Sequence, residues 1–389
     1  MFEYFDGNYP WNSATVMVLN TGAQIAEVDD VLSPIKHLAA GATDQANEAF
    51  CQAWQNAAQK VEGFAEADEA LGNLRAAGGK YARAAGYYFA AERQTSVKDP
   101  NRLALYRNML HAFTKYVALR REPCERVEIP FDNGTSLPAL YVRGKGAVAR
   151  KPCIVHFDGL DVNKEWIYLS GMPHELAERG VSTLIVDHPG VGEALRLRGL
   201  KSIVEIERAA SASVDWLITQ SDVDPERIGM MAPSLGGYYA MRSAAHEPRF
   251  RCVVAWGAMY DFGAGVRRRL AGNGTQKSVH HFFDHVQWVT GASNLEEALR
   301  IADQMTLKGI LDRIRCPMLV VHGENDRQVS LDAAKQVYAE AINSVKKELK
   351  VHTLAEGGSE HCSIDNMSLS IDYIAHWIAR TLDAPKELA

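Results

Sequence analysis

The sequence has few cysteines, no long run of one charge and no extended apolar stretch. Its six cysteines are scattered without C-x-x-C spacing, which argues against a disulfide framework and a zinc site. Lys and Arg total 42 against 48 Asp and Glu, a formal net charge of −6, so neither nucleic acid nor anionic membranes are expected partners. No apolar segment approaches a membrane span, and the acidic, aromatic residues 1–6 are unlike a signal peptide. We expect a cytoplasmic protein whose partner is a small-molecule substrate.

The chain changes character near position 122. The earlier part has almost no β-branched runs but is rich in Ala, Leu, Glu, Lys and Arg, which favour helices. We therefore predict a helical N-terminal domain over residues 1–122. Its expected helices include 45–60, 66–76, 79–94 and a further one ending near Arg120. Gly63, Gly72 and Gly78-Gly79 are expected to separate the first three.

Residues 123–389 alternate short apolar runs with helix-forming segments. The runs 126–131 and 137–142 flank Asp132-Asn133-Gly134, which predicts an antiparallel hairpin. Six later runs alternate with helical segments, a pattern typical of parallel strands covered by helices. We expect those strands at 152–157, 182–187, 227–231, 252–257, 317–322 and 349–354.

A serine follows one of these runs on a turn of small residues, Ala232-Pro233-Ser234-Leu235-Gly236. Little side-chain bulk two residues before and two after the serine permits the sharp strand-to-helix turn of a nucleophile elbow, here with alanine in place of the usual first glycine. The turn would lift the Ser234 hydroxyl above the sheet and leave the N–H of Leu235 to bind an oxyanion. An ordinary Gly/Ser turn is the alternative interpretation.

An acid and a histidine follow in the order that an α/β-hydrolase requires. Asp326 comes after the run 317–322, and His361 ends a Gly-rich loop after the last run. We predict that Ser234 is the nucleophile, His361 the general base and later acid, and Asp326 the residue that orients the imidazole. Glu324, in the same loop, is the rival acid. The predicted fold is an α/β-hydrolase with an eight-stranded, mostly parallel sheet.

The second oxyanion donor is expected in the loop after the third strand, residues 158–165. Gly159 lets the backbone approach the substrate closely, and the amide of Leu160 is the candidate donor. A plain strand-to-helix turn, with Asn163 as the helix N-cap, is compatible with the same residues.

An insertion over 262–312, after the sixth strand, is predicted to form a lid. It contains His281 and His285, which are four residues apart on a presumed helix, a spacing that could hold a metal. No third ligand accompanies them in the motif, so we expect lid packing or substrate contact and neither a metal nor a cofactor.

Several segments together resemble one family, that of 2,6-dihydroxypseudooxynicotine hydrolase and the fungal hydrolases that shorten polyketides on the way to melanin. The resemblance rests on the loop 159–165 (Gly-Leu-Asp-Val-Asn-Lys-Glu), the elbow 234–237, and the segments 246–250 and 256–261. It implies a serine triad that hydrolyses a carbon–carbon bond next to a ketone in an aromatic or polyketide-derived substrate. It also implies a helical domain that helps cover the site, and a homodimer.

The resemblance further implies an auxiliary acid near the nucleophile. Asp261 is the first candidate by motif, followed by Asp158 and Asp161, and a loop-capping role is at least as plausible for each. Aromatic side chains would suit such a substrate, and core packing is their alternative role. The candidate substrate contacts include Tyr238, Tyr260 and Trp288.

The leading hypothesis is thus a serine hydrolase that cleaves a carbon–carbon bond. A carboxylesterase or lactonase would need the same triad and oxyanion hole, so motifs barely separate the two. A hypothesis from another class is a non-catalytic interaction protein built on a hydrolase scaffold.

Overall fold

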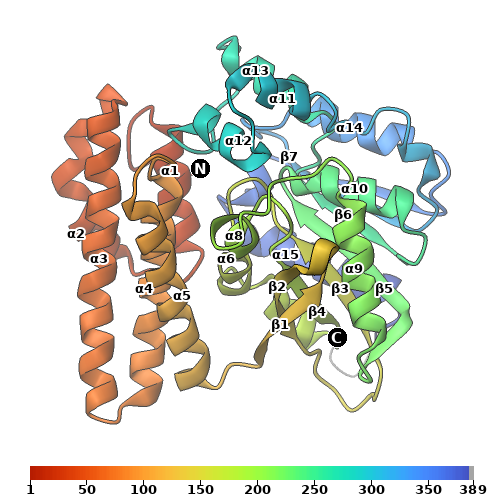
Figure 1. The fold of residues 1–389 in the computed structure, drawn as a ribbon, viewed down its shortest axis with the longest axis horizontal. Coiled ribbons are helices and arrows are strands. Elements are labelled where there is room, and N and C mark those ends of the chain that lie inside the picture. Colours follow the sequence, from red (N-terminus) through yellow and green to blue (C-terminus); the bar gives the residue numbers. More distant parts are fainter. Residues whose placement is uncertain (385–389) are drawn as a thin grey trace. The chain divides into compact units, whose positions relative to one another are not determined.

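The computed structural model describes residues 1–384, which form two compact units. The helical unit consists of Met1–Pro123 and Gln276–Val286, and the sheet unit of Cys124–Thr275 and the chain from Gln287 on. Residues 276–286 come from the middle of the expected lid insertion, so part of that insertion packs with the N-terminal helices rather than with the sheet (Figure 1).

Long helices that lie side by side dominate the helical unit (Figure 1). Its elements are α1 (Tyr9–Leu19), α2 (Ile25–Leu32), η1 (Ser33–Gly41), α3 (Asp44–Ala70), α4 (Leu74–Gln94) and α5 (Asn101–Arg120). Aromatic side chains from α1, α3 and α4 form its core, where the rings of Trp11 and Phe50 stack with centroids 4.5 Å apart.

The expected helix breaks at Gly63 and Gly78-Gly79 are wrong, because α3 and α4 run through these glycines. An interior glycine costs a helix only about 1 kcal/mol relative to alanine, which tertiary packing outweighs. Gly78 shows the compensation, since a Cβ at this position would lie 2.6 Å from Cγ of Arg120 on α5. The glycine permits close approach of two helices. The break at Gly72, where φ is +80°, is found as expected.

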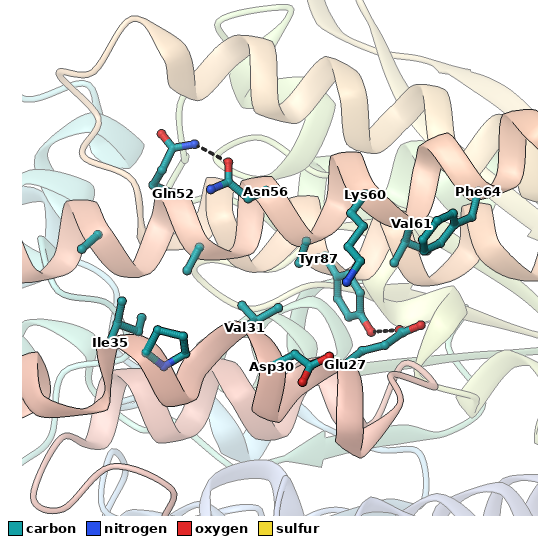
Figure 2. A pocket seen from close by; sticks show the side chains of 14 residues that line it. Glu27, Asp30, Val31, Ile35, Gln52, Asn56, Lys60, Val61, Phe64 and Tyr87 are labelled. Atoms are coloured by element: carbon teal, nitrogen blue, oxygen red, sulfur yellow. Dashed lines mark hydrogen bonds between the residues drawn. The ribbon is translucent and has the colours of Figure 1, made fainter.

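A cavity of about 520 Å³ lies between α3 and the α2–η1 segment of the helical unit. Figure 2 shows Val61 and Phe64 of α3 on one side of the cavity and Val31 and Ile35 on the other. The carboxylate of Glu27 at its edge is paired, because the guanidinium of Arg83 and the hydroxyl of Tyr87 both donate to it.

The sheet unit contains one eight-stranded sheet in the order β1-β2-β4-β3-β5-β6-β7-β8. The strands are β1 (Cys124–Pro130), β2 (Ser136–Val142), β3 (Lys151–Phe157), β4 (Ser182–Val186), β5 (Val223–Pro233), β6 (Val253–Trp256), β7 (Met318–Gly323) and β8 (Lys347–His352). Only the β1–β2 and β2–β4 pairings are antiparallel. The predicted strands are confirmed, with β5 beginning four residues before the predicted start at 227. This is the α/β-hydrolase arrangement that the sequence predicts.

Helices pack against this sheet between successive strands. They are α6 (Lys164–Leu169), α7 (Met172–Glu178), α8 (Gly192–Arg196), α9 (Glu207–Ile218), α10 (Gly236–His246), α14 (Leu331–Glu340) and α15 (Met367–Thr381). The insertion after β6 contributes α11 (Phe262–Leu270), α12 (Phe282–Thr290) and α13 (Leu295–Ala302). Short 3-10 turns complete the chain: η2 (Asp132–Gly134), η3 (Leu311–Arg313) and η4 (His361–Ser363). Within residues 1–384, none of the helices has the length and apolar character needed to cross a membrane.

Candidate active site

Ser234 lies on a sharp turn between β5, which ends at Pro233, and α10, which begins at Gly236. Its φ of +63° is in the left-handed region, a conformation that is costly for a residue with a side chain and recurs at functional sites. A Cβ on Gly236 would lie 2.5 Å from Cβ of Ala232. The missing side chain at Gly236 therefore explains how the turn accommodates alanine where the first glycine of the elbow usually stands.

The imidazole of His361 lies between the serine and the acid. Its Nε2 is 2.7 Å from Oγ of Ser234, and its Nδ1 is 2.7 Å from Oδ2 of Asp326. A carboxylate only accepts hydrogen bonds, so Nδ1–H of His361 donates to Asp326 and leaves Nε2 of the neutral ring to accept the serine proton. The other carboxylate oxygen of Asp326 accepts from the backbone N–H groups of Gln328 and Val329, at 2.8 and 2.9 Å.

An ion pair fixes the acid loop against the histidine loop. Glu360, which precedes the histidine, accepts from the guanidinium of Arg327 at 3.0 Å and from the side-chain amide of Asn325 at 2.9 Å. The two loops also touch through the backbone, since a Cβ on Gly323 would lie 2.1 Å from the carbonyl oxygen of Ser359. These contacts, formed by residues flanking Asp326 and His361, hold the two side chains in register.

Burial and neighbouring charges shift the pKa values of Asp326 and His361 in opposite directions. Burial raises the pKa of Asp326, but the facing imidazole of His361 and the N–H donors outweigh it and lower the pKa below its ordinary value. Burial lowers the pKa of His361, while the Asp326 charge, and then the neighbouring Cys362, raise it well above 6.5. Asp326 therefore stabilises the imidazolium that forms when His361 takes a proton.

The rival acid points elsewhere. Oε2 of Glu324 accepts from the N–H of Leu354 at 2.9 Å, so its carboxylate supports the loop after β8, whereas Asp326 meets the histidine. His322, on β7, has its Nε2 3.5 Å from Oδ2 of Asp326. Sequence reasoning missed this neighbour because a histidine inside a buried strand carries no distinguishing signal.

The loop after β3 lies directly against the nucleophile. A Cβ on Gly159 would lie 3.1 Å both from Cβ of Ser234 and from the carbonyl oxygen of Pro233. The amide of Leu160 belongs to this loop, and that of Leu235 stands at the start of α10, where the first N–H groups of a helix lack a carbonyl partner within it. Gly159, which precedes Leu160, thus lies against the elbow, and the roles of Leu160 and Leu235 as oxyanion donors stay predictions.

A buried ion cluster supports this loop, and sequence reasoning did not assign it. The Lys164 cluster (Lys164, Glu165, Asp187 and Glu193) has Nζ of Lys164 2.7 Å from Glu165, 2.8 Å from Asp187 and 3.2 Å from Glu193. The lysine side chain is 0% exposed. Its backbone N–H also donates to Asp187 at 2.9 Å. The adjacent Lys-Glu of the loop motif therefore anchors residues 158–165 to the segment after β4.

The candidate auxiliary acids differ in their surroundings. Asp158 is fully buried, neither carboxylate oxygen has a hydrogen-bond partner in the described part of the chain, and burial together with Asp187 raises its pKa well above 3.8. Asp261 caps α11, accepting from the N–H of Ala264 at 2.8 Å, which favours its capping role. Asp161 is buried in the loop 158–165.

The candidate aromatic contacts make hydrogen bonds or ring contacts of their own. The hydroxyl of Tyr238 donates to the carbonyl of Val204 at 3.2 Å, and that of Tyr260 donates to Glu340 at 2.9 Å. The Trp288 ring is half-buried, with Nζ of Lys201 5.5 Å from its centroid. Each of these contacts is with a residue other than Ser234, His361 and Asp326.

The strained serine on a mostly parallel sheet, hydrogen-bonded to a buried histidine, defines an enzyme of the α/β-hydrolase class. More narrowly, the chain belongs to the prolyl oligopeptidase family, whose family model matches residues 176–384.

Relatives cover nearly the whole chain. The hydrolase acrC of Aspergillus aculeatus is 28% identical over 412 residues, which are 94% of each protein. The 2,6-dihydropseudooxynicotine hydrolase of Paenarthrobacter nicotinovorans is 28% identical over 352 residues, 90% of this chain and 89% of that protein. A crystal structure of the 2,6-dihydroxy-pseudo-oxynicotine hydrolase has the same fold, with a TM-score of 0.74 and 24% identity over 94% of this chain and 95% of that one. The resemblance read from the motifs is confirmed.

Proposed function

We propose that this enzyme hydrolyses a carbon–carbon bond next to a ketone in an aromatic or polyketide-derived substrate, with Ser234, His361 and Asp326 as its catalytic triad. The observation that carries the triad is His361, whose two ring nitrogens lie 2.7 Å from the serine hydroxyl and 2.7 Å from the aspartate. The substrate class is supported by the loop motif 159–165 and by the similarity to a hydrolase named for 2,6-dihydropseudooxynicotine.

In the first step Oγ of Ser234 attacks the ketone carbon while Nε2 of His361 takes the hydroxyl proton. The carbonyl oxygen becomes an oxyanion, which the N–H groups of Leu160 and Leu235 stabilise. The negative charge of Asp326 stabilises the imidazolium formed at the same moment.

In the second step the oxyanion collapses and the adjacent carbon–carbon bond breaks. Its electron pair moves onto the leaving carbon, which an aromatic ring or a second carbonyl must delocalise, and the imidazolium of His361 returns the proton to that fragment. Water, deprotonated by His361, then attacks the acyl ester on Ser234; the bond between the acyl carbon and Oγ breaks, and His361 returns its proton to the serine. The products are a carboxylic acid and a fragment with a new C–H bond. The overall reaction is therefore the hydrolysis of one ketone by one water molecule.

Labelling with a fluorophosphonate tests the nucleophile. Intact protein should carry one label on Ser234, and Ser234→Ala should carry none at that position. Absence of label from the folded native enzyme would reject the triad, and with it the whole proposal.

A matched substrate pair tests the bond that is cleaved. An aryl β-diketone and the ester of the same acyl group are followed by mass spectrometry, with Ser234→Ala as the blank. We expect the diketone to be split into acid and ketone. Rapid turnover of the ester with the diketone untouched would replace the proposal by a carboxylesterase or lactonase that uses the same triad.

We further propose a homodimer, which the family resemblance implies. Size-exclusion chromatography with light scattering measures the mass directly, and a value near the chain mass of 42.9 kDa at micromolar concentration would reject it.

A further inference from the structure

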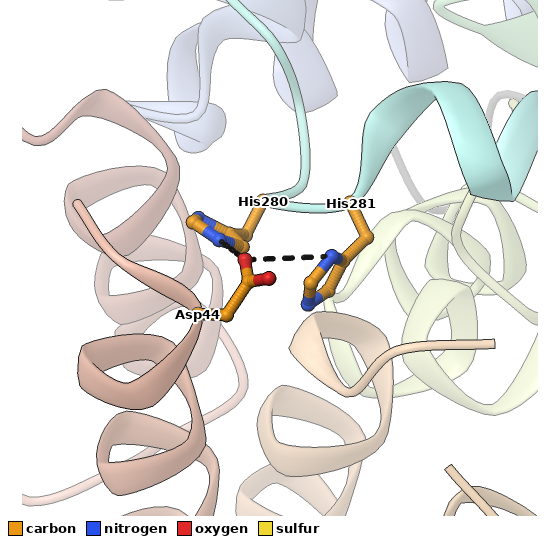
Figure 3. Close-up of side chains that lie close together, drawn as sticks. All are labelled: Asp44, His280 and His281. Carbon is orange, nitrogen blue, oxygen red and sulfur yellow. Dashed lines mark hydrogen bonds and ion pairs between the residues drawn. The ribbon is translucent and has the colours of Figure 1, made fainter. Parts of the chain in front are cut away.

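Folding brings Asp44 beside two consecutive histidines, His280 and His281, which come more than 230 residues later in the chain (Figure 3). Nε2 of His280 lies 2.8 Å from Oδ1 of Asp44, and Nδ1 of His281 lies 4.0 Å from the same oxygen. One donor atom from each residue falls within 4.8 Å of the others. We propose that Asp44, His280 and His281 form a binding site for one divalent transition-metal ion, with Zn²⁺ as the reference ion.

The donor set and its spacing fit such an ion. Imidazole nitrogens and a carboxylate oxygen are ligands that zinc and its neighbours prefer. With metal–ligand bonds of about 2.0–2.2 Å, donors around a tetrahedral ion lie about 3.3 Å apart. The observed separations of 2.8 and 4.0 Å fall on either side of that value, so small side-chain rotations suffice.

The ligands stand on anchored backbone. Asp44 lies in the first turn of α3, which Thr43 caps by accepting from the N–H of Ala46 at 3.1 Å. The N–H of His280 donates to Oε1 of Gln94 at 3.1 Å, and the carbonyl of His281 accepts from the N–H at the first turn of α12 at 2.9 Å. Such preorganisation lowers the ordering entropy that a metal would otherwise have to overcome.

Other charged groups lie near the cluster in the helical unit, notably Lys98, whose Nζ pairs with Oδ2 of Asp284 at 3.1 Å.

There is room for further ligands. Asp44 and His281 line a polar cavity of about 510 Å³, which Glu48, one helical turn after Asp44, also lines. Water or the Glu48 carboxylate can complete the coordination sphere from this cavity. A bound ion would link the insertion segment 276–286 to α3, and so contribute to the stability of the helical unit.

This site differs from the i, i+4 pair that the sequence offers. Nδ1 of His285 lies 3.5 Å from the guanidinium of Arg102. His281 instead faces Asp44, which comes 237 positions earlier in the chain. The third ligand was therefore invisible in the motif.

Calorimetric titration of Zn²⁺ into the full-length, chelator-treated protein tests the site. We expect one ion per chain, at least tenfold weaker binding in Asp44→Asn, His280→Ala and His281→Ala, and no change in His37→Ala, the control, whose side chain is exposed on η1. Since His361 could also bind zinc, the titration is repeated in His361→Ala, which should keep the full stoichiometry. Circular dichroism verifies that each variant retains its helices.

Two further measurements test whether the ion binds at this cluster. Co²⁺ should give visible d–d absorption that the Asp44→Asn variant loses, and Zn²⁺ should raise the melting temperature of the native chain but not that of the variant. Absence of saturable binding, or binding unaffected by the three substitutions, would reject the metal site and leave the cluster as a hydrogen-bonded His–Asp pair. None of these measurements involves Ser234, so they can fail while the proposed function stands.

Discussion

Replacing Lys164 with methionine tests how much the Lys164 cluster, which anchors residues 158–165, contributes to stability. Methionine keeps a similar length and volume but removes the only positive charge among the four members of the cluster. The side chain is 0% exposed and its Nζ contacts three carboxylates at 2.7, 2.8 and 3.2 Å. Removing one partner from a buried ion pair typically costs about 3–5 kcal/mol, because an uncompensated charge stays buried.

The contacts that the carboxylates keep without Lys164 place the loss of stability at the low end of that range. Glu193 keeps Arg126 at 2.5 Å, and Asp187 keeps the backbone N–H of Glu193 at 2.7 Å. Burial raises the pKa of Glu165 to about 7 even with the lysine present, so in the variant this group takes up a proton instead of remaining charged. We expect the free energy of unfolding to fall by about 3 kcal/mol at pH 7, which corresponds to a fall in melting temperature of roughly 6–12 °C.

The loss should also depend on pH. In the native protein Glu165 ionises as the pH rises through about 7, whereas without Lys164 its pKa lies higher and the folded variant binds more protons. Since a folded state that binds excess protons loses stability as pH rises, the destabilisation should be larger at pH 8 than at pH 6.

Thermal unfolding at pH 6 and pH 8 measures both effects, with Lys145→Met as the matched control. Lys145 pairs with Glu178 on the surface, where both side chains are more than half exposed, and such a pair contributes at most about 1 kcal/mol. A Lys164→Met protein that melts within about 2 °C of native at pH 8, or a control that loses as much, would refute the reasoning. A smaller loss at pH 8 than at pH 6 would refute the role of Glu165.

Three further predictions concern catalysis. Asp326→Asn should lower kcat by about 10⁴ through the wrong imidazole tautomer, while Glu324→Gln in the same loop should stay within about twofold of native; equal losses in steady-state kinetics would contradict the assignment. The kcat/KM profile should fall as pH drops through the pKa of His361, which Asp326 raises above 6.5, and this limb should move to lower pH in Asp326→Asn; an unmoved limb would exclude His361 as the titrating base. Gly159→Ala, whose Cβ would lie 3.1 Å from Cβ of Ser234, should lower kcat at least tenfold with little change in melting temperature; undiminished turnover would show that the loop can shift.

The order of Ser234, Asp326 and His361 was readable from the sequence because each follows a short apolar strand at the start of a turn or loop. These are local signals, set by a few neighbouring side chains. The sequence favoured Asp326 as the orienting acid but kept Glu324 as a rival, for a physical reason. Both acids leave the same strand, and only the turn that directs one toward Leu354 and the other toward His361 separates them.

The glycines of the helical unit show where local reasoning failed. Gly78 was expected to interrupt a helix, yet α4 continues through it because α5 packs so closely that a side chain would collide with Arg120. Propensity describes a helix in isolation, whereas the cost of a glycine here is offset by contacts with another helix.

The sequence by itself determined the eight strands and their alternation with helices, the elbow around Ser234, and the chain order of the candidate triad, since periodicity and turn chemistry act over a few residues. Only the tertiary structure decided which acid meets His361, how Lys164 gathers three carboxylates, and that His280 and His281 meet Asp44 within the helical unit. Those outcomes depend on segments brought together by burial of apolar surface, and no local pattern encodes which polar side chains then become neighbours.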